Sequence, residues 1–389
     1  MNYTELKNYL EQQYPSALEL WKHIVTLESW SSDHRAVATL AAHLDTYFNA
    51  LGLQTRKYDY PNAGPSLMAC TSATKLAPIA LMAHMDTVHK PGSFGDKLFK
   101  LDDQGILRGP GVHDCKGGLV TAVLVLKALQ NLGYSKRQLK FLLVGDEEVA
   151  HSECQEQSLD FYVQEGKGAA VAFNFESAMP GEDIVLRRKG GAIIKVQVFG
   201  KSAHAGKAPW DGANAILAAA KMIEQLEALT SYATGMFYNC GKINGGTAVN
   251  VIPDYCEFEV GLRFPTNEDF AAAYAKVQEI AQSYTTERIS AKVTRKATFK
   301  AMEETPKTAT LFALYQQACE QLGYPRPEGL KVGGCSDAAY MTMQNIPTLC
   351  AVGARGDNDH SLQEYAFAHS IVDSAAKITA TILALPDDF

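Results

Sequence analysis

The sequence predicts an α/β protein in which a mixed, mainly parallel sheet with helices on both faces carries an inserted α+β domain. Short, almost wholly apolar runs, typical of strands buried on both faces of a sheet, occur at residues 78–83, 139–144 and 169–175. Residues 117–133, between the first two runs, are rich enough in Leu and Ala to form a buried helix. Strand, helix and strand in this order indicate a parallel sheet.

Two further segments belong to this plan. Apolar residues recur at helical spacing over residues 36–51, and Gly52 follows at the position of a C-terminal cap. The α/β pattern resumes after about residue 300. It comprises a helix-like segment at 310–323, a strand-like segment at 346–352 and a helix-like tail. We therefore expect the α/β domain to be discontinuous.

The sequence between these parts has a different hydropathy pattern. Residues 192–200 and 256–264 alternate apolar with polar side chains, as strands with one solvated face do, and they enclose a helix-like segment at 213–229. We predict an α/β domain of residues 1–185 and 300–389 and an inserted α+β domain of residues 186–299.

Composition narrows the function classes. The 43 acidic and 36 basic residues give a formal charge of −7, which offers no general attraction for nucleic acid or an anionic membrane. The first 15 residues lack the apolar core of a signal peptide, and no apolar run approaches membrane-spanning length. Eight scattered cysteines without a CxxC pair suit reduced thiols. We expect a soluble, cytoplasmic protein that acts on small molecules or peptides.

Ionisable side chains follow the predicted strands where each strand ends. Ligands collect at the carboxyl ends of strands in open α/β sheets. The residues at these ends, and in a glycine-rich turn and a late loop, are His84, Asp86, Asp114, Asp146, Glu147, Glu148, Glu176 and His360. So many acids and imidazoles at one edge of a sheet require a neutralising charge, for which a bound cation is the simplest source.

The donor types indicate which cation. Carboxylate oxygens mixed with imidazole nitrogens suit zinc, or a neighbour such as cobalt or manganese. Two His and three carboxylates hold two metals if one carboxylate bridges them, and such a pair can activate water and stabilise a tetrahedral intermediate. Of the adjacent acids Glu147 and Glu148, one can then bind metal while the other takes a proton from water.

Each motif alone has a simpler explanation. A histidine and an aspartate two positions apart are more often a packed or solvated pair, and the acidic run at 146–148 alone is usually a solvated turn. Asp357 and Asp359 are most simply residues that form the loop around His360. The joint arrangement at matching strand ends favours the metal site over these alternatives.

The motifs together resemble those of the M20 metallopeptidases, which are di-zinc hydrolases, and within them the glutamate carboxypeptidase (carboxypeptidase G2) branch. Nearly the whole chain carries the resemblance, in the order AHMDTV, GPGVHDCKGG, GDEE, FNFES, GKSAHAG, NVIP, GGCSDAAY and DNDHS. The resemblance implies two zinc ions in a catalytic domain, a lid and dimerisation domain, and a homodimer formed through that lid.

The resemblance also implies roles for the residues at the strand ends. Asp114 bridges two metals, of which one is completed by His84 and Glu176 and the other by Glu148 and His360. Glu147 is the general base. Asp86 orients His84, a role that also makes physical sense by itself. The peptide bond between Asp114 and Cys115 is expected to be cis, as is common in the family.

Residues outside this cluster are assigned in the same way. His204 looks like the histidine that reaches an active site, often that of the neighbouring subunit, to stabilise the oxyanion; the alternative is a loop histidine. Asn250 and Arg263 resemble contacts to the substrate carboxylate. Arg263 shares a strand face with Glu257 and Glu259, so a surface ion pair is its alternative role. Gly333 and Gly334 let backbone amides approach the substrate.

The chain departs from the family pattern at three places. The segment DEEVAHSEC at residues 146–154 replaces sequences such as DEEKGS beside the predicted base. Cys115 and Cys335 stand where relatives more often carry Asp or Thr. None of these changes removes a predicted ligand, but the loop change leaves the shape of the substrate subsites open.

Hydrolysis of an amide bond to a C-terminal amino acid is the expected reaction, with glutamate as the leading guess. Glutamate at position 176, rather than aspartate, goes with carboxypeptidase and deacylase activity in the family. An N-acyl amino acid deacylase or a dipeptidase on the same scaffold is the close alternative. A metal-dependent binding protein without turnover and a structural assembly protein are the alternatives from other classes.

Overall fold

The computed structural model describes residues 3–154 and 157–389. The chain folds into two compact units. The first comprises residues 1–187, 303–331 and 336–389, and the second comprises residues 188–302 and 332–335.

A large sheet forms the centre of the first unit. Its strand order is β1-β2-β6-β3-β7-β16-β8-β15. The bounds of these strands are β1 (Gln54–Tyr60), β2 (Ala63–Cys70), β3 (Leu76–His84), β6 (Arg137–Gly145), β7 (Val171–Asn174), β8 (Ile184–Arg188), β15 (Gly329–Val332) and β16 (Thr348–Cys350). Strands β6, β3, β7 and β16 run parallel, while β1, β2 and β8 pair antiparallel with their neighbours. The predicted fold class and its buried strands are confirmed.

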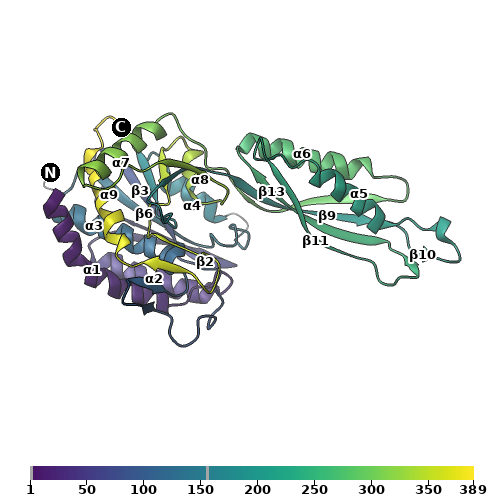
Figure 1. Cartoon of the computed structure of the whole chain (residues 1–389), viewed down its shortest axis with the longest axis horizontal. Coiled ribbons are helices and arrows are strands. Elements are labelled where there is room, and N and C mark those ends of the chain that lie inside the picture. Colours follow the sequence, from purple (N-terminus) through teal and green to yellow (C-terminus); the bar gives the residue numbers. More distant parts are fainter. Residues whose placement is uncertain (1–2, 155–156) are drawn as a thin grey trace. The chain divides into compact units, whose positions relative to one another are not determined.

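Helices cover both faces of this sheet (Figure 1). Their bounds are α1 (Tyr3–Thr26), α2 (His34–Ala50), α3 (Gly118–Asn131), α4 (Gln157–Gly166), α7 (Thr308–Gln321), α8 (Ala338–Thr342) and α9 (Ser370–Ala384). On β6, Phe141 packs against Phe48 of α2, whereas the adjacent Lys140 bonds to Glu165 of α4. Because neighbouring side chains on a strand point to opposite faces, α2 and α4 lie on opposite sides of the sheet.

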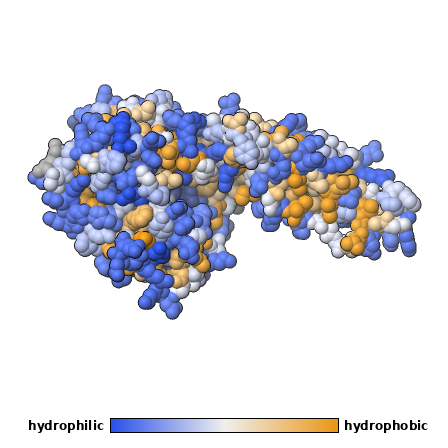
Figure 2. Space-filling model, in the orientation of Figure 1, coloured by the Kyte–Doolittle hydropathy of each residue, from blue (hydrophilic) through white to orange (hydrophobic). Residues whose placement is uncertain are grey.

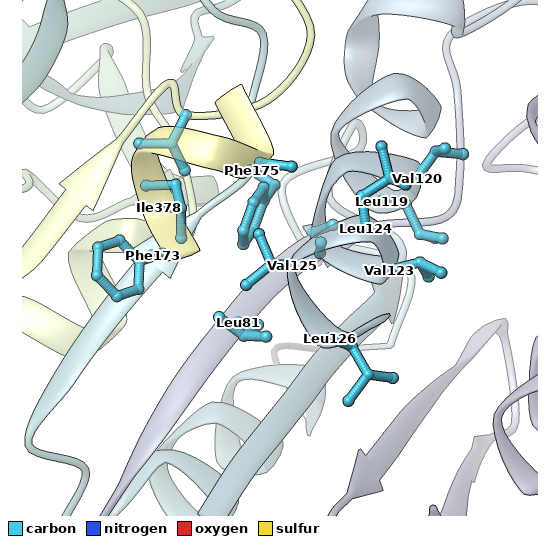
Figure 3. Close-up of a cluster of buried hydrophobic side chains, with 14 of the residues drawn as sticks. Leu81, Leu119, Val120, Val123, Leu124, Val125, Leu126, Phe173, Phe175 and Ile378 are labelled. Atoms are coloured by element: carbon cyan, nitrogen blue, oxygen red, sulfur yellow. The ribbon is translucent and has the colours of Figure 1, made fainter. Parts of the chain in front are cut away.

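Helix α3 is buried because it lies between the sheet and other helices. Its Val125 belongs to a cluster with Leu81 of β3 and Ile378 of α9 (Figure 3). Fully burying each such side chain stabilises the fold by about 1.5–3 kcal/mol. A Cβ on Gly118, at the start of α3, would lie 1.7 Å from the carbonyl oxygen of Phe175, so only glycine allows this close approach. The contact holds the start of α3 against the end of β7.

A smaller sheet lies beside the start of α3 and orders two loops. Its strands are β4 (Lys100–Leu101), β5 (Ile106–Arg108), β17 (Gly356–Asp357) and β18 (Tyr365–Phe367), in the order β17-β18-β5-β4. Strand β5 leads into a short π-helical turn, η1 (Val112–Gly117), which precedes α3. Since β18 pairs with β5, the loop between β17 and β18 is held near this turn.

The second unit has its own sheet and core. The strands β9 (Gly190–Phe199), β11 (Phe237–Gly245), β13 (Tyr255–Phe264) and β14 (Ser290–Phe299) form an antiparallel sheet in the order β11-β13-β9-β14. Helices α5 (Ala215–Glu227) and α6 (Asn267–Ser283) pack together on one face of it (Figure 1). Short strands β10 (Ala203–His204) and β12 (Val251–Ile252) pair separately. None of the helices described in either unit is long and apolar enough to cross a bilayer.

Candidate metal centre

The carboxyl ends of three neighbouring strands bring the predicted site residues of the first unit together. Strand β3 ends at His84, which pairs in register with Val144 of β6, and the chain continues from β6 into Glu147 and Glu148. Strand β7, on the other side of β3, is followed by Glu176. Parallel pairing therefore places these groups at one edge of the sheet.

Asp114 connects the groups of this edge. Its Oδ1 lies 2.9 Å from Nε2 of His84, and its Oδ2 lies 3.2 Å from Nε2 of His360. The same nitrogen of His360 lies 3.1 Å from Oε2 of Glu148. The peptide bond from Asp114 to Cys115 is cis, which confirms the expectation. One carboxylate thus faces two separate sets of donors, as a bridging ligand would.

These donor sets fit divalent cations. Ligand atoms of Asp114, Glu148 and His360 all lie within 4.8 Å of one another, as do those of His84, Asp114 and Cys115. The Cys115 thiol accepts the main-chain N–H of His84 at 3.2 Å, and burial raises the pKa of this thiol. The remaining donors are imidazole nitrogens and carboxylate oxygens, which suit zinc, cobalt or manganese.

Glu147 and Glu176 are both buried, and the charges of Glu176 and His84 act on Glu147. Only 7% of Glu176 and 8% of Glu147 is exposed. Burial raises the pKa of Glu147 well above its usual value, and the negative charge of Glu176 raises it further. A carboxylate in such surroundings takes up a proton readily, which is the property of a general base.

The other acids show how strongly this cluster attracts positive charge. Burial and the neighbouring Asp114 raise the pKa of Glu148 to about 8. Hydrogen bonds to Asp114 and Glu148 raise the pKa of His360 to about 11. Burial tends to raise the pKa of Asp114, but hydrogen bonds from His360 and His84 outweigh it and lower that pKa below its usual range. The cluster holds protons where cations can replace them.

Asp86 is tied more closely to the acidic pair than to His84. Its Oδ1 accepts the main-chain N–H of Glu147 at 3.2 Å, and its Oδ2 accepts that of Glu148 at 3.1 Å and the hydroxyl of Ser31 at 2.7 Å. Nδ1 of His84 lies 3.0 Å from the main-chain oxygen of Asp86 and 3.5 Å from its carboxylate. Asp86 therefore orders both the turn that carries the acids and the His84 ring.

Two supporting groups were missed in the sequence. The buried carboxylate of Glu364 accepts main-chain N–H groups from the turn that carries Asp114, namely those of Gly111, His113 and Asp114, and lies 2.6 Å from Nε2 of His89. Asp359, which lies in the loop around His360 as expected, also pairs with Nδ1 of His113. Both contacts join positions more than 240 residues apart, so no local pattern indicates them.

The predicted residues of the second unit lie on its surface. His204 is exposed on β10, and its Nδ1 accepts the N–H of Gly206 at 3.1 Å. Asn250 is also exposed, and its main-chain oxygen accepts the N–H of Ala205, next to His204. Gly333 has open space around its Cα, and the carbonyl oxygen of Gly334 lies 3.4 Å from Arg188.

Arg263 does not form the surface ion pairs that were its alternative role. Glu257 pairs with Lys195 at 2.5 Å, and Glu259 pairs with Lys296 at 2.9 Å. The guanidinium of Arg263 lies over Gly191, where an added Cβ would be 2.0 Å from Nη1. Because Gly191 has no side chain, the guanidinium of Arg263 can lie against the sheet at this position.

Comparison with known proteins adds to this geometry. Residues 80–384 match the family model described as peptidase family M20/M25/M40. Carboxypeptidase G2 of a Pseudomonas species is 27% identical over 90% of this chain and 84% of its own length. Acetylornithine deacetylase of Myxococcus xanthus is 32% identical over 49% of this chain and 51% of its own.

Solved structures show the same fold. The aminopeptidase PepT of Bacillus cereus has a TM-score of 0.78 at 24% identity, covering 95% of this chain and 98% of its own. An M20 family metallo-carboxypeptidase of Sulfolobus solfataricus has a TM-score of 0.76 at 16% identity, covering 94% of this chain and 98% of its own. The sequence and structure comparisons agree with each other along nearly the whole chain.

Proposed function

Because the chain belongs to peptidase family M20/M25/M40, and so is a hydrolase of amide bonds, we propose that it is a carboxypeptidase that releases a C-terminal amino acid, with glutamate as the leading candidate. The observation that carries this proposal is the position of Asp114, whose two oxygens face His84 and His360 separately. Of the two sequence relatives described above, the one that aligns over 90% of the chain is named a carboxypeptidase.

We assign two divalent cations to the site, zinc being the first choice and cobalt or manganese the alternatives. His84, Asp114 and Glu176 would hold one, and Asp114, Glu148 and His360 would hold the other. When bound, the pair supplies Lewis-acid activation of water and of the substrate carbonyl. The carboxylate of Asp86 accepts hydrogen bonds from the main-chain N–H groups of Glu147 and Glu148. In this proposal these bonds fix the turn, so that one acid can bind metal while the other transfers the proton.

In this proposal Glu147 transfers the proton. It accepts a proton from the attacking water and delivers it to the leaving nitrogen, and its raised pKa suits both steps. His204 is assigned to the oxyanion, within one chain or from a second subunit. Asn250 and Arg263 are assigned to the free carboxylate of the substrate, and Gly333 and Gly334 to backbone contacts with it.

A deacylase is the second candidate, because the Myxococcus relative at 32% identity is named an acetylornithine deacetylase. Both reactions break an amide bond and differ in the groups on its two sides. A substrate panel separates them: purified protein with zinc or manganese is offered N-acyl-glutamates and folate-type conjugates, other N-acyl amino acids, and dipeptides. Release of glutamate at the highest kcat/KM supports the carboxypeptidase; preference for another class replaces it with a deacylase or a dipeptidase.

We also propose that the chain forms a homodimer through the second unit. Apolar side chains gather on the face of that unit seen in Figure 2. Its large exposed apolar residues include Ile193, Phe199, Trp210, Leu217, Tyr232, Ile243 and Val249. Light scattering tests the proposal: a mass near twice the 42.3 kDa of one chain supports it, and a monomer at micromolar concentration contradicts it.

A further inference from the structure

His151 is fully buried in the loop after β6, inside the segment that departs from the family pattern. Its Nδ1 lies 3.0 Å from Oδ1 of Asp146 and 2.8 Å from the hydroxyl oxygen of Ser158, and its Nε2 lies 2.7 Å from Oδ1 of Asp337. A neutral imidazole carries one N–H and would turn a lone pair toward one of these carboxylates. The Ser158 hydroxyl donates its one hydrogen to Oδ2 of Asp146, so it leaves none for Nδ1, and only the imidazolium can donate to both carboxylates. Burial tends to lower the pKa of His151, but Asp337 and Asp146 raise it well above its usual value.

Helix α4 completes the hydrogen bonding of both carboxylates. The hydroxyl of Ser158 donates to Oδ2 of Asp146 at 3.0 Å, and the hydroxyl of Tyr162 donates to Oδ2 of Asp337 at 2.7 Å. All of these groups are buried, with Asp337 2% exposed. A buried, hydrogen-bonded ion triad of this kind is costly to break, because removing one member leaves an uncompensated charge.

The triad is attached to the metal centre on two sides. Asp146 directly precedes the acidic pair of Glu147 and Glu148. The main-chain N–H of His151 donates to the main-chain oxygen of Asp146 at 3.1 Å, which closes the loop. Asp337 follows Ser336, which lies 3.3 Å from the side chain of Asn174 at the end of β7. Glu176 follows two residues later. His151 thus connects the end of β6 with the end of β7.

We propose that His151 is a positioning residue for Glu147, acting as a charged clamp between Asp146 and Asp337. The part of this inference that concerns catalysis rests on the proposed function. The clamp keeps the turn that carries Glu147 in place relative to the strand end that carries Glu176. A shift of about 1 Å in such a group costs on the order of 100-fold in rate, while substrate binding is little changed.

The main test compares H151Q with K140Q. Lys140 lies on β6, the strand that precedes the loop of His151, and forms a mostly buried ion pair with Glu165 at 2.7 Å, so K140Q controls for loss of a stabilising pair. Both variants are assayed with full metal content, below their unfolding temperatures. We expect kcat of H151Q to fall at least tenfold with KM within about twofold of the original, and kcat of K140Q to stay within twofold. An unchanged kcat in folded, metal-loaded H151Q overturns the proposal.

A second variant and a second measurement cover other outcomes. Y162F removes one hydrogen bond to Asp337 and keeps the triad, so it should fold even if H151Q does not, and a kcat loss of a few fold is expected. Hydrogen exchange at the amides of Glu147 and Glu148 needs no substrate. Faster exchange in H151Q than in K140Q supports the clamp even if the original protein hydrolyses nothing in the panel, in which case only the proposed function fails; equal exchange contradicts the clamp.

Discussion

The carboxylate of Asp86 accepts the main-chain N–H of Glu147 at 3.2 Å, across 61 positions of sequence. The second oxygen of Asp86 accepts the N–H of Glu148, so one buried side chain holds the turn in which a proposed base and a proposed ligand are adjacent. The roles of two neighbouring acids therefore depend on a third acid from another strand.

Replacing Asp86 should impair the site without removing a ligand. Asparagine has one carbonyl oxygen, so D86N can accept only part of the bonds now made to Glu147, Glu148 and Ser31. We expect a loss of about 10–100-fold in activity or metal affinity, measured by kcat/KM and zinc titration. D102N is the matched control, since the exposed Asp102 also accepts two main-chain N–H groups. Equal effects of the two variants would contradict this role.

Replacing Glu147 should remove proton transfer and keep the metals. E147Q has nearly the same size and cannot accept the proton, so kcat should fall by about 10²–10⁴-fold. Metal content, measured by mass spectrometry, should stay unchanged. E153Q, in the same loop, should retain normal kcat because Glu153 bonds to the side chains of His34 and Ser32 and is assigned no part in the proton transfer. Full activity of E147Q would remove Glu147 from its assigned role.

Metal stoichiometry should reflect the two donor sets. The chelator-treated protein should be inactive and regain activity with about two equivalents of zinc, since the bridging arrangement is that of a two-metal site. The variant H360A should bind one of the two equivalents of zinc less tightly than the original protein does. H369A is its control, because His369 is exposed to a similar degree, pairs with Glu11 and contacts the ring of Tyr14. Tight binding of two equivalents by H360A would exclude His360 as a ligand.

The metal-free protein should lose stability as pH rises from about 5 to 8. The pKa of Glu148 is raised from 4.5 to about 8, so between these values the folded state binds more protons than the unfolded state. The slope of unfolding free energy with pH is then negative. His360, whose pKa is raised from 6.5 to about 11, adds the same sign above pH 6.5.

Denaturant unfolding at several pH values measures this slope. Zinc competes with the protons on Glu148 and His360, and these protons bind less as pH rises. The increase in unfolding free energy on adding zinc should therefore grow with pH over the same range. The variant E148Q should show a flatter slope in the metal-free state. Stability that rises with pH in the metal-free protein would show that the acids are not held together in solution.

Arg263 should determine the affinity for substrates with a free carboxylate. R263M should raise KM about tenfold or more for an N-acyl-glutamate and leave KM for its α-amide unchanged. R288M is the control, because Arg288 is an exposed arginine of the same unit that bonds to the main chain of Trp210. A similar KM change for acid and amide would contradict carboxylate recognition by Arg263.

The order of apolar runs was sufficient to predict the centre of the fold. Residues 78–83, 139–144 and 169–175 became β3, β6 and β7, because strands buried on both faces need continuous apolar sequence. Parallel pairing then puts their carboxyl ends together, so the sequence predicts that His84 and Glu176 lie at one edge of the sheet.

The sequence by itself determined the strands, their direction and the kinds of side chain at their ends, since these depend on periodicity and on local order. Only the tertiary structure decided what holds those side chains: the carboxylate of Glu364 under the turn of Asp114, the pairing of Asp359 with His113, and the buried contact of His151 with Asp337. Hydrogen bonds of this kind depend on distances between segments 186 or more positions apart, and the chain encodes these distances only through the packing of the whole core.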